Sequence, residues 1–245
     1  KVPFGQKKVT GIVLSYKDKS KFDKLRSVEE VLDQEALLSK EILDFLFWSA
    51  SYYHHPIGEV LSNAIPKNLR IGKPAVIKKE TTINDNSSPS LLKQTSEQKK
   101  AVADILKYEN SFHGFLLHGV TGSGKTEVYL SITEWLLKKG KQVLVLVPEI
   151  GLTPQMIARF EQRIKDKVVA VHSQLNETQK QDAYLMAKSG EAKVVLGTRS
   201  AIFTPIPKLG LVIVDEEHDG SFKQQSNFRY SARDLSVMRD RKSVV

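Results

Sequence analysis

A glycine-rich segment that ends in lysine and threonine constrains the fold of this chain more than any other feature. Residues 119–126 read Gly-Val-Thr-Gly-Ser-Gly-Lys-Thr and fit the pattern G-x-x-x-x-G-K-[ST], in which backbone N–H groups surround phosphates. The apolar run at 115–117 precedes this segment, and a helical pattern at 125–139 follows it. A strand, a glycine loop and a helix in this order predict a phosphate-binding loop at the edge of a parallel sheet.

The residue types of this loop suit a nucleotide and its metal ion. Glycines let the backbone turn tightly enough for several N–H groups to converge on one anion. The lysine brings a full charge to the β- and γ-phosphates, and the threonine offers a hydroxyl to Mg²⁺. The alternative is a glycine-rich turn without a ligand. We expect nucleotide contacts from Gly119, Val120, Thr121, Gly122, Ser123, Gly124, Lys125 and Thr126.

An acidic cluster follows another apolar run. Residues 211–214 are Leu-Val-Ile-Val, and Asp215-Glu-Glu-His218 comes directly after them. At the end of a buried strand, Asp215 can hold Mg²⁺ with Thr126, usually through water, and Glu216 can polarise an attacking water. Together with Lys125, these two carboxylates are the candidate catalytic residues of an ATP or GTP site.

The second half of the chain alternates apolar runs with helical patterns. The runs lie at 115–117, 143–147, 168–171, 193–196 and 211–214, and the helical patterns lie at 125–139, 154–164 and 176–189. This alternation predicts an α/β fold, a parallel sheet with helices on both faces. Ligands of such sheets bind at the carboxyl ends of the strands.

The first half has a different character. Residues 2–16 have the apolar and turn residues of a β structure, and residues 28–65 are expected to be helical, with a break at 56–58. Two short helices followed by a basic stretch predict a small helix-turn-helix or winged-helix module. Its aromatic residues are expected in its core rather than as a base-stacking platform: Phe45, Phe47, Trp48, Tyr52 and Tyr53. His54 and His55 lack a third metal ligand and are expected at a turn or surface.

These patterns divide the chain into four parts. Residues 1–16 end an amino-terminal β domain, 17–79 form the winged-helix domain, 80–96 form a polar linker, and 97–245 form the α/β lobe. Because the chain begins with lysine, we expect a piece of a longer protein.

Composition supports a polyanionic partner. The chain has 37 Lys and Arg against 28 Asp and Glu, a net charge of +9. Residues 1–28 carry eight basic and two acidic side chains, whereas residues 29–66 carry one and seven. There is no cysteine, so no thiolate metal site exists in these residues. No apolar run approaches the roughly 20 residues of a membrane helix, so we expect a cytoplasmic chain without membrane contact.

The acidic cluster resembles the second motif, the DEAH box, of superfamily 2 helicases, and further motifs follow in the expected order. Gln98 lies 21 residues before Gly119 and resembles the glutamine with which these helicases recognise adenine. Residues 147–155 and 197–201 resemble the motifs that hold the backbone of single-stranded DNA. Both segments follow apolar strands and offer hydroxyl, amide or guanidinium groups to phosphates. The resemblance implies DNA contacts by Thr153, Gln155, Arg199 and Ser200.

Longer strings resemble a narrower group, the PriA family of replication-restart helicases. They lie at 119–129, 215–219, 221–225 and 228–234. Residues 48–58 resemble the winged-helix region of that family, and residues 2–5 with 11–13 resemble the end of its amino-terminal DNA-binding domain. The resemblance covers nearly the whole chain.

This resemblance implies an ATP-dependent 3′-to-5′ DNA helicase that supports primosome assembly at stalled forks. The implied cofactors are ATP and Mg²⁺, and the implied partners are single-stranded and forked DNA, other primosome proteins and single-strand-binding protein. The resemblance also implies that residues 97–245 form a RecA-like lobe that is incomplete at its C-terminal end. The family has in addition a second motor lobe with a catalytic arginine and a zinc module. Because neither is found here, zinc is expected only in the parent, and this piece should bind ATP and DNA without full turnover.

An aromatic and basic loop at 220–230 follows the acidic cluster. In the family such a loop couples DNA binding to ATP hydrolysis, through rings that stack on bases and cations that hold phosphates. The residues concerned are Phe222, Lys223, Phe228, Arg229 and Tyr230. The alternative is a partly buried connector.

Two other functions remain open from the sequence. One is another superfamily 2 translocase, such as a RecG-like motor. The other is a non-catalytic DNA-binding scaffold with a vestigial nucleotide site, which the intact Lys125, Thr126, Asp215 and Glu216 argue against.

Overall fold

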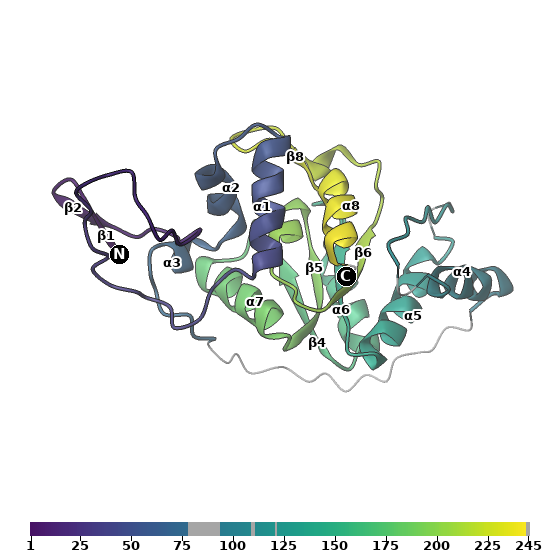
Figure 1. Cartoon of the computed structure of the whole chain (residues 1–245). Helices are drawn as coiled ribbons and strands as arrows, with labels where there is room; N and C mark the ends of the chain where they lie inside the picture. Colours follow the sequence, from purple (N-terminus) through teal and green to yellow (C-terminus); the bar gives the residue numbers. More distant parts are fainter. Residues whose placement is uncertain (78–93, 109–110, 121, 244–245) are drawn as a thin grey trace.

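Four parallel strands organise the second half of the chain (Figure 1). The computed structural model describes residues 1–77, 94–108, 111–120 and 122–243. Across the sheet the strands run in the order β4 (Lys167–Val171), β5 (Ala192–Gly197), β3 (Gln142–Leu146) and β6 (Leu209–Val214). All three pairings are parallel. This mixed α/β arrangement confirms the predicted RecA-like sheet and four of its five expected strands.

Helices cover both faces of this sheet because its strands are apolar on both sides. In β3, Val143 and Val145 pack against one face with α5 (Lys125–Lys138) and α6 (Pro154–Arg163). Leu144 and Leu146 point to the other face, which α7 (Glu177–Ser189) and α8 (Ala232–Ser243) cover. Alternation of apolar side chains between two covered faces is typical of a buried parallel strand. α4 (Ser96–Leu106) packs outside α5.

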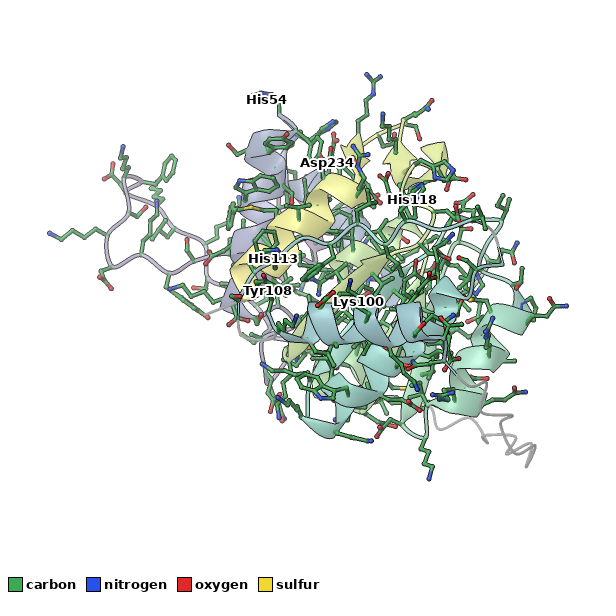
Figure 2. The ribbon with its side chains drawn as sticks, turned by 90° about the vertical axis from the view of Figure 1, so that its right-hand side faces the viewer. His54, Lys100, Tyr108, His113, His118 and Asp234 are labelled. Carbon is green, nitrogen blue, oxygen red and sulfur yellow. The ribbon has the colours of Figure 1, made fainter. Side chains whose placement is uncertain are left out.

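The fifth predicted strand, at residues 115–117, is absent from the sheet. Phe115 and Leu116 are exposed, and the segment pairs with no strand of the described chain. The Phe115 ring instead contacts His113 and Tyr108, which stack on each other beyond the end of α4 (Figure 2). The prediction of a strand here is therefore wrong for this structure. An apolar run forms a strand only when a neighbouring strand accepts its backbone hydrogen bonds.

The first half is simpler than its sequence predicts. β1 (Val2–Phe4) and β2 (Lys7–Val9) form an antiparallel hairpin away from the sheet (Figure 1). The sequence pattern predicts helix at 28–39, but the first helix, α1 (Lys40–Tyr52), begins only after Ser39, whose hydroxyl accepts a hydrogen bond from the Ile42 N–H. Such a serine cap sets the start of a helix. α2 (Ile57–Ala64) and α3 (Lys67–Arg70) follow.

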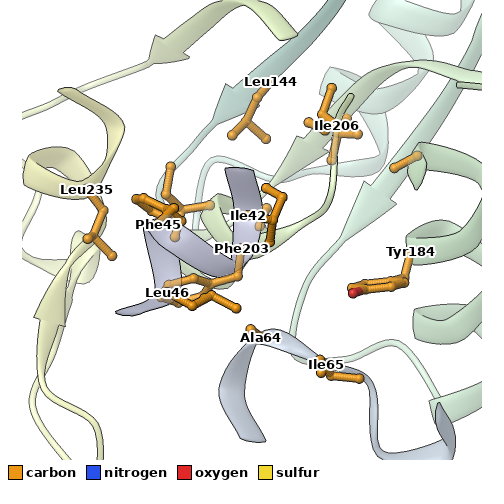
Figure 3. Close-up of a cluster of buried hydrophobic side chains, with 14 of the residues drawn as sticks. Ile42, Phe45, Leu46, Ala64, Ile65, Leu144, Tyr184, Phe203, Ile206 and Leu235 are labelled. Carbon is orange, nitrogen blue, oxygen red and sulfur yellow. The ribbon is translucent and has the colours of Figure 1, made fainter. Parts of the chain in front are cut away.

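We call residues 40–70, which contain α1, α2 and α3, the helical module. Within residues 17–77 the structure has no strand and thus no β-wing. The module packs on the sheet, since Phe45 and Leu46 of α1 share one hydrophobic core with Leu144, Phe203 and other residues of the lobe (Figure 3). The two parts therefore stabilise each other. Residues 80–93 of the predicted linker lie outside the described residues.

The aromatic residues of the module divide into three groups. Trp48 and Tyr53 are partly buried and pack against the core. Phe45 is buried and contacts the Phe203 ring, as expected for a core residue. Phe47 and Tyr52 are exposed, which differs from the expectation, because they lie on the face of α1 that turns away from the sheet. In the described part of the chain, no helix has the length and apolarity to cross a membrane.

Candidate nucleotide site and nucleic-acid interface

The loops that follow β3, β5 and β6 lie at one edge of the sheet, because all these strands run in the same direction. The loop after β3 carries the predicted DNA contacts at 147–155, and the loop after β5 carries those at 197–201. The loop after β6 carries the acidic cluster. The 3₁₀ helix η1 (Arg199–Phe203) follows β5, and η2 (Gly220–Phe222), β7 (Lys223–Gln224) and β8 (Tyr230–Ser231) follow the acidic cluster. The fold therefore gathers the candidate site residues along one edge.

The phosphate loop is held in a turned conformation before α5. Gly122 and Gly124 both have a φ of +82°, a left-handed conformation that glycine adopts without strain. A Cβ at Gly124 would also collide with the Gln98 amide. The Ser123 N–H donates to the Val120 carbonyl at 3.1 Å and closes the turn. Thr121 lies outside the described residues.

Lys125 links this loop to the acidic cluster. Its Nζ donates to the Gly119 carbonyl at 2.8 Å and lies 3.5 Å from Glu216 Oε1. Glu216 has a φ of +47°, which is uncommon for a residue with a side chain and often marks a functional site. The lysine and the carboxylate predicted to act on the same phosphate are thus in contact across the edge of the sheet.

A second contact joins α5 to the acidic cluster, and the sequence motifs alone assign no role to it. The hydroxyl of Tyr129, on α5, donates to Asp215 Oδ1 at 3.1 Å. Burial and the neighbouring Asp215 carboxylate raise the pKa of this hydroxyl well above its usual range, so it stays protonated as a donor. Tyr129 lies four residues after Lys125, on the same helix face, and that spacing is the available signal.

The oxygen donors present are compatible with Mg²⁺. Tyr129 orients the Asp215 carboxylate, and Thr126 adds a hydroxyl in the first turn of α5. No group of three His, Asp or Glu side chains suited to a metal occurs among the described residues. Mg²⁺ does not require one, because it binds through one or two carboxylates together with waters and substrate phosphates.

Gln98 lies against the phosphate loop. Its side-chain Nε2 donates to the carbonyls of Ser123 at 3.2 Å and Gly124 at 3.5 Å. Its Oε1 accepts from the Thr95 N–H at 3.0 Å, within the capping box that starts α4. The structure thus brings the predicted adenine-recognition residue to the nucleotide loop, where it supports the backbone of that loop.

Arg199 connects the three loops of the predicted DNA surface. Its Nη1 donates to the Ser221 carbonyl at 3.0 Å, and its Nη2 lies 3.8 Å from Glu149 Oε1. Thr153 caps α6 by accepting from the Met156 N–H at 3.2 Å. The other predicted contacts expose their side chains along this edge: Gln155, Ser200, Lys223 and Arg229.

The aromatic residues of the loop at 220–230 are not exposed as base stacking requires. Phe222, Phe228 and Tyr230 are at most 5% exposed and belong to the core that the helical module shares with the lobe. The Phe228 ring lies between Phe203 and Tyr53. In this structure the rings therefore act as a connector, and stacking on bases would require them to leave the core.

Two residues of the helical module hold this loop, and no sequence pattern predicts either interaction. His55 Nε2 accepts a hydrogen bond from the Arg229 N–H at 3.2 Å, and the His55 ring contacts Phe228 edge-on. The other ring nitrogen, Nδ1, lies 3.1 Å from Glu59 Oε2. The Tyr53 hydroxyl is hydrogen-bonded to the backbone of Ser231. His55 is thus partly enclosed between two elements rather than free at the surface. His54 is exposed at the turn, at the far end of α1 in Figure 2.

Comparison with protein families and curated proteins places both halves of the chain. Residues 1–66 match the family model described as 3′DNA-binding domain (3′BD), a range that extends beyond the β hairpin and includes all of α1 and α2. Residues 91–237 match the model described as type III restriction enzyme, res subunit.

Relatives of known name share substantial identity with the chain. It is 35% identical to the replication restart protein PriA of Haemophilus influenzae over 97% of this chain and 43% of that protein. The PriA of Rickettsia felis is 37% identical over 97% of this chain and 36% of its own length. The PriA of Synechocystis is 51% identical over 65% of this chain and 19% of its own length. The chain thus spans less than half of the length of each of these three relatives. It belongs to the PriA family of replication restart proteins, with a helicase-type domain at residues 91–237.

Proposed function

We propose that this chain forms the nucleotide site and part of the DNA track of an ATP-dependent helicase that moves 3′-to-5′ and restarts replication at stalled forks. The contact between Lys125 and Glu216, at 3.5 Å, carries the proposal. It joins the phosphate loop to the acidic cluster, the two elements that any such motor must bring to one γ-phosphate.

Each side chain of the site has a distinct task in this proposal. Lys125 leaves the Gly119 carbonyl and Glu216 to hold the β- and γ-phosphates of ATP, whose negative charge attracts it more strongly. Glu216 is then free to orient and polarise the attacking water. Thr126 and Asp215 hold Mg²⁺, which neutralises charge on the phosphates when it is bound.

The DNA track runs along the same edge of the sheet. Thr153, Gln155, Arg199 and Ser200 offer polar groups from the loops after β3 and β5, and Lys223 and Arg229 add two cations from the loop after the acidic cluster. Contacts of this kind bind the phosphate backbone and carry no sequence preference. Arg199 touches the loops at both Glu149 and Ser221, so DNA bound there can shift the loop that follows Glu216.

The complete activity belongs to a longer protein in this proposal. The matched relatives are more than twice the length of this chain, and their PriA names associate them with replication restart. We propose that unwinding, rapid turnover and contacts with primosome proteins and single-strand-binding protein require the remaining part. The 245-residue chain should bind ATP and DNA but hydrolyse ATP slowly.

The test is the variant Glu216→Gln in the full-length protein, assayed beside wild type for ATP hydrolysis with single-stranded, duplex and forked DNA. Loss of a general base lowers turnover by about 10²–10⁴-fold, while nucleotide affinity stays within a few-fold. Glu217→Gln is the matched control, because Glu217 is a neighbouring carboxylate that pairs with Arg233 outside the phosphate loop. It should retain most of the activity.

The outcomes separate the proposed motor from its alternatives. Equal turnover in wild type and Glu216→Gln would overturn the catalytic assignment. No DNA-dependent hydrolysis even in wild type would favour a scaffold with a vestigial nucleotide site. Stimulation by duplex alone, with none by forks or single strands, would favour a translocase unrelated to fork restart.

A further inference from the structure

A cavity of about 320 Å³ lies at the boundary between the helical module and the lobe. We call it the seam cavity. One wall comes from the end of α2 and from α3, and the other comes from α7, the loop after β4 and η1. It is separate from the phosphate loop and the acidic cluster, none of whose residues line it. A volume of this size has room for about ten waters of about 30 Å³ each, and hence for a polar group as large as a sugar phosphate.

Basic side chains dominate the charged lining of this cavity. Lys67 and Arg70 contribute from α3, and Lys180 contributes from α7. The one carboxylate among the lining residues is Glu177, and Lys180 already pairs with it at 3.0 Å. Three cations against one carboxylate leave the lining positive, which favours an anionic ligand.

The two walls are fixed to each other, so the cavity is a built feature of the fold. Gln181 of α7 donates from Nε2 to the carbonyl of Pro74, just after α3, at 2.8 Å. Arg70 donates from Nε to the Ile65 carbonyl at 3.0 Å, which holds its guanidinium at the cavity. Both wall segments also contribute to the shared hydrophobic core.

The position of the cavity identifies the source of the anion. Its lining includes Ser200, one of the proposed DNA contacts, and Ser173 in the loop after β4. Both lie at the edge of the sheet along which the DNA track runs. A strand that leaves Ser200 along this edge would bring a phosphate to the seam cavity, whereas a nucleotide in the phosphate loop would not.

We propose that the seam cavity binds a phosphodiester group of single-stranded DNA, held by Lys67, Arg70 and Lys180. This inference rests on the proposed DNA-binding function and extends it, since it makes the helical module and the lobe a joint clamp on one strand. DNA binding then stabilises the contact between the two parts, because each part supplies ligands to the same phosphate.

The decisive variant is Lys67→Ala in the 245-residue chain, with a fluorescein-labelled oligodeoxythymidylate as the probe. The magnitude of the slope of log Kd against log salt should fall by about 0.7, the value for one phosphate contact with a single strand. Lys73→Ala is the matched control, because Lys73 lies just after α3 and is exposed like Lys67 but does not line the cavity. It should keep the parent slope.

A fluorescent ATP analogue distinguishes the two sources of phosphate. Its Kd should be the same for the parent and for Lys67→Ala. An unchanged salt slope in Lys67→Ala, with a parent that binds DNA, would overturn the seam cavity and leave the proposed function standing. Weaker binding of the ATP analogue alone would overturn a DNA site. A parent that does not bind the oligonucleotide would overturn both proposals.

Discussion

The Tyr53 hydroxyl forms two hydrogen bonds with the backbone of Ser231, a residue 178 positions later in the chain. It accepts from the Ser231 N–H at 3.2 Å and donates to the Ser231 carbonyl at 3.4 Å. The Tyr53 side chain, at the end of α1, therefore forms hydrogen bonds with both backbone groups of Ser231. Ser231 connects the loop at 220–230 to α8. The helical module thus fixes the position of a loop that belongs to the α/β lobe.

Tyr53→Phe should lower the free energy of unfolding by about 1–2 kcal/mol. The substitution keeps the ring but leaves two backbone groups of the 7%-exposed Ser231 without this partner. Urea denaturation measures the change. Tyr52→Phe is the control, because Tyr52 is 56% exposed and should lose almost nothing. Equal stability of the two variants would show that the Tyr53 hydroxyl does not hold the loop.

Phe228→Ala should act first on stability. The Phe228 side chain is 0% exposed and contacts the rings of Tyr53, His55, Phe203 and Tyr230, so truncation leaves a cavity in the shared core. We expect a loss of about 3–5 kcal/mol. Thermal unfolding measures it. A variant that unfolds like the parent but loses DNA-stimulated ATP hydrolysis in the full-length protein would instead support direct stacking of this ring on a base.

The cations of the same loop offer a cleaner test of DNA binding. Lys223 and Arg229 are exposed, so substitution by alanine should not disturb the core. Each change should weaken oligonucleotide binding and lower the magnitude of the salt slope by about 0.7 for each phosphate that the variant no longer neutralises. A slope equal to that of the parent in both variants would place the DNA elsewhere.

The sequence predicts the sheet well where an apolar run has a neighbouring strand in the described part of the chain. The runs at 143–147, 168–171, 193–196 and 211–214 form strands within two residues at each end, because continuous apolar stretches with covering helices leave few other arrangements. The run at 115–117 is also apolar but lies outside the sheet. Composition cannot specify the neighbour with which a strand pairs.

The candidate site shows a similar division. The phosphate loop and the acidic cluster are predictable because their chemistry requires particular residues at fixed spacing, and the fold brings Lys125 to Glu216. The burial of Phe228 and the interactions of His55 are not predictable, because they depend on how the helical module packs on the lobe. Tyr129 falls between these cases, since its spacing from Lys125 places it on the right face but does not identify Asp215 as its partner.

Arg163→Met should destabilise the chain by about 3–5 kcal/mol, the loss expected when one partner of a buried ion pair is removed. Arg163, at the end of α6, lies 3.1 Å from the carboxylate of Glu127, which is 5% exposed directly after the phosphate loop. The arginine also forms two hydrogen bonds with the more exposed Glu134, at 2.6 and 3.1 Å. Without the arginine, the Glu127 charge is left buried.

Urea denaturation of a double-mutant cycle tests this ion pair. Glu127→Gln in the Arg163→Met background should recover part of the loss, because the amide removes the uncompensated charge. Arg159→Met is the control for the loss of an exposed arginine from the same helix. A loss no larger than that of the control would contradict the prediction.

His172 should make the chain less stable at mildly acidic pH. It lies in the loop after β4 and lines the seam cavity. Burial, assisted by the charge of Lys180, lowers the pKa of its imidazole below the usual value of 6.5. Between the folded pKa and 6.5 the unfolded chain binds more protons than the folded chain, so stability rises with pH across this window and falls on acidification. The ion pair of Glu177 and Lys180 weakens only at lower pH, because the hydrogen bond with Lys180 lowers the pKa of Glu177 below 4.5.

His172→Gln isolates this contribution. The other five of the six histidines are common to both proteins, so their effects cancel when the free energies of unfolding are subtracted. Urea denaturation from about pH 7.5 to about pH 5.5 should show the parent losing more stability than the variant as the pH falls. Parallel curves would mean that the imidazole titrates in the folded chain as it does in the unfolded chain. Bound single-stranded DNA should reduce the difference if its phosphate enters the seam cavity, because a nearby negative charge favours the protonated imidazole and offsets the lysine.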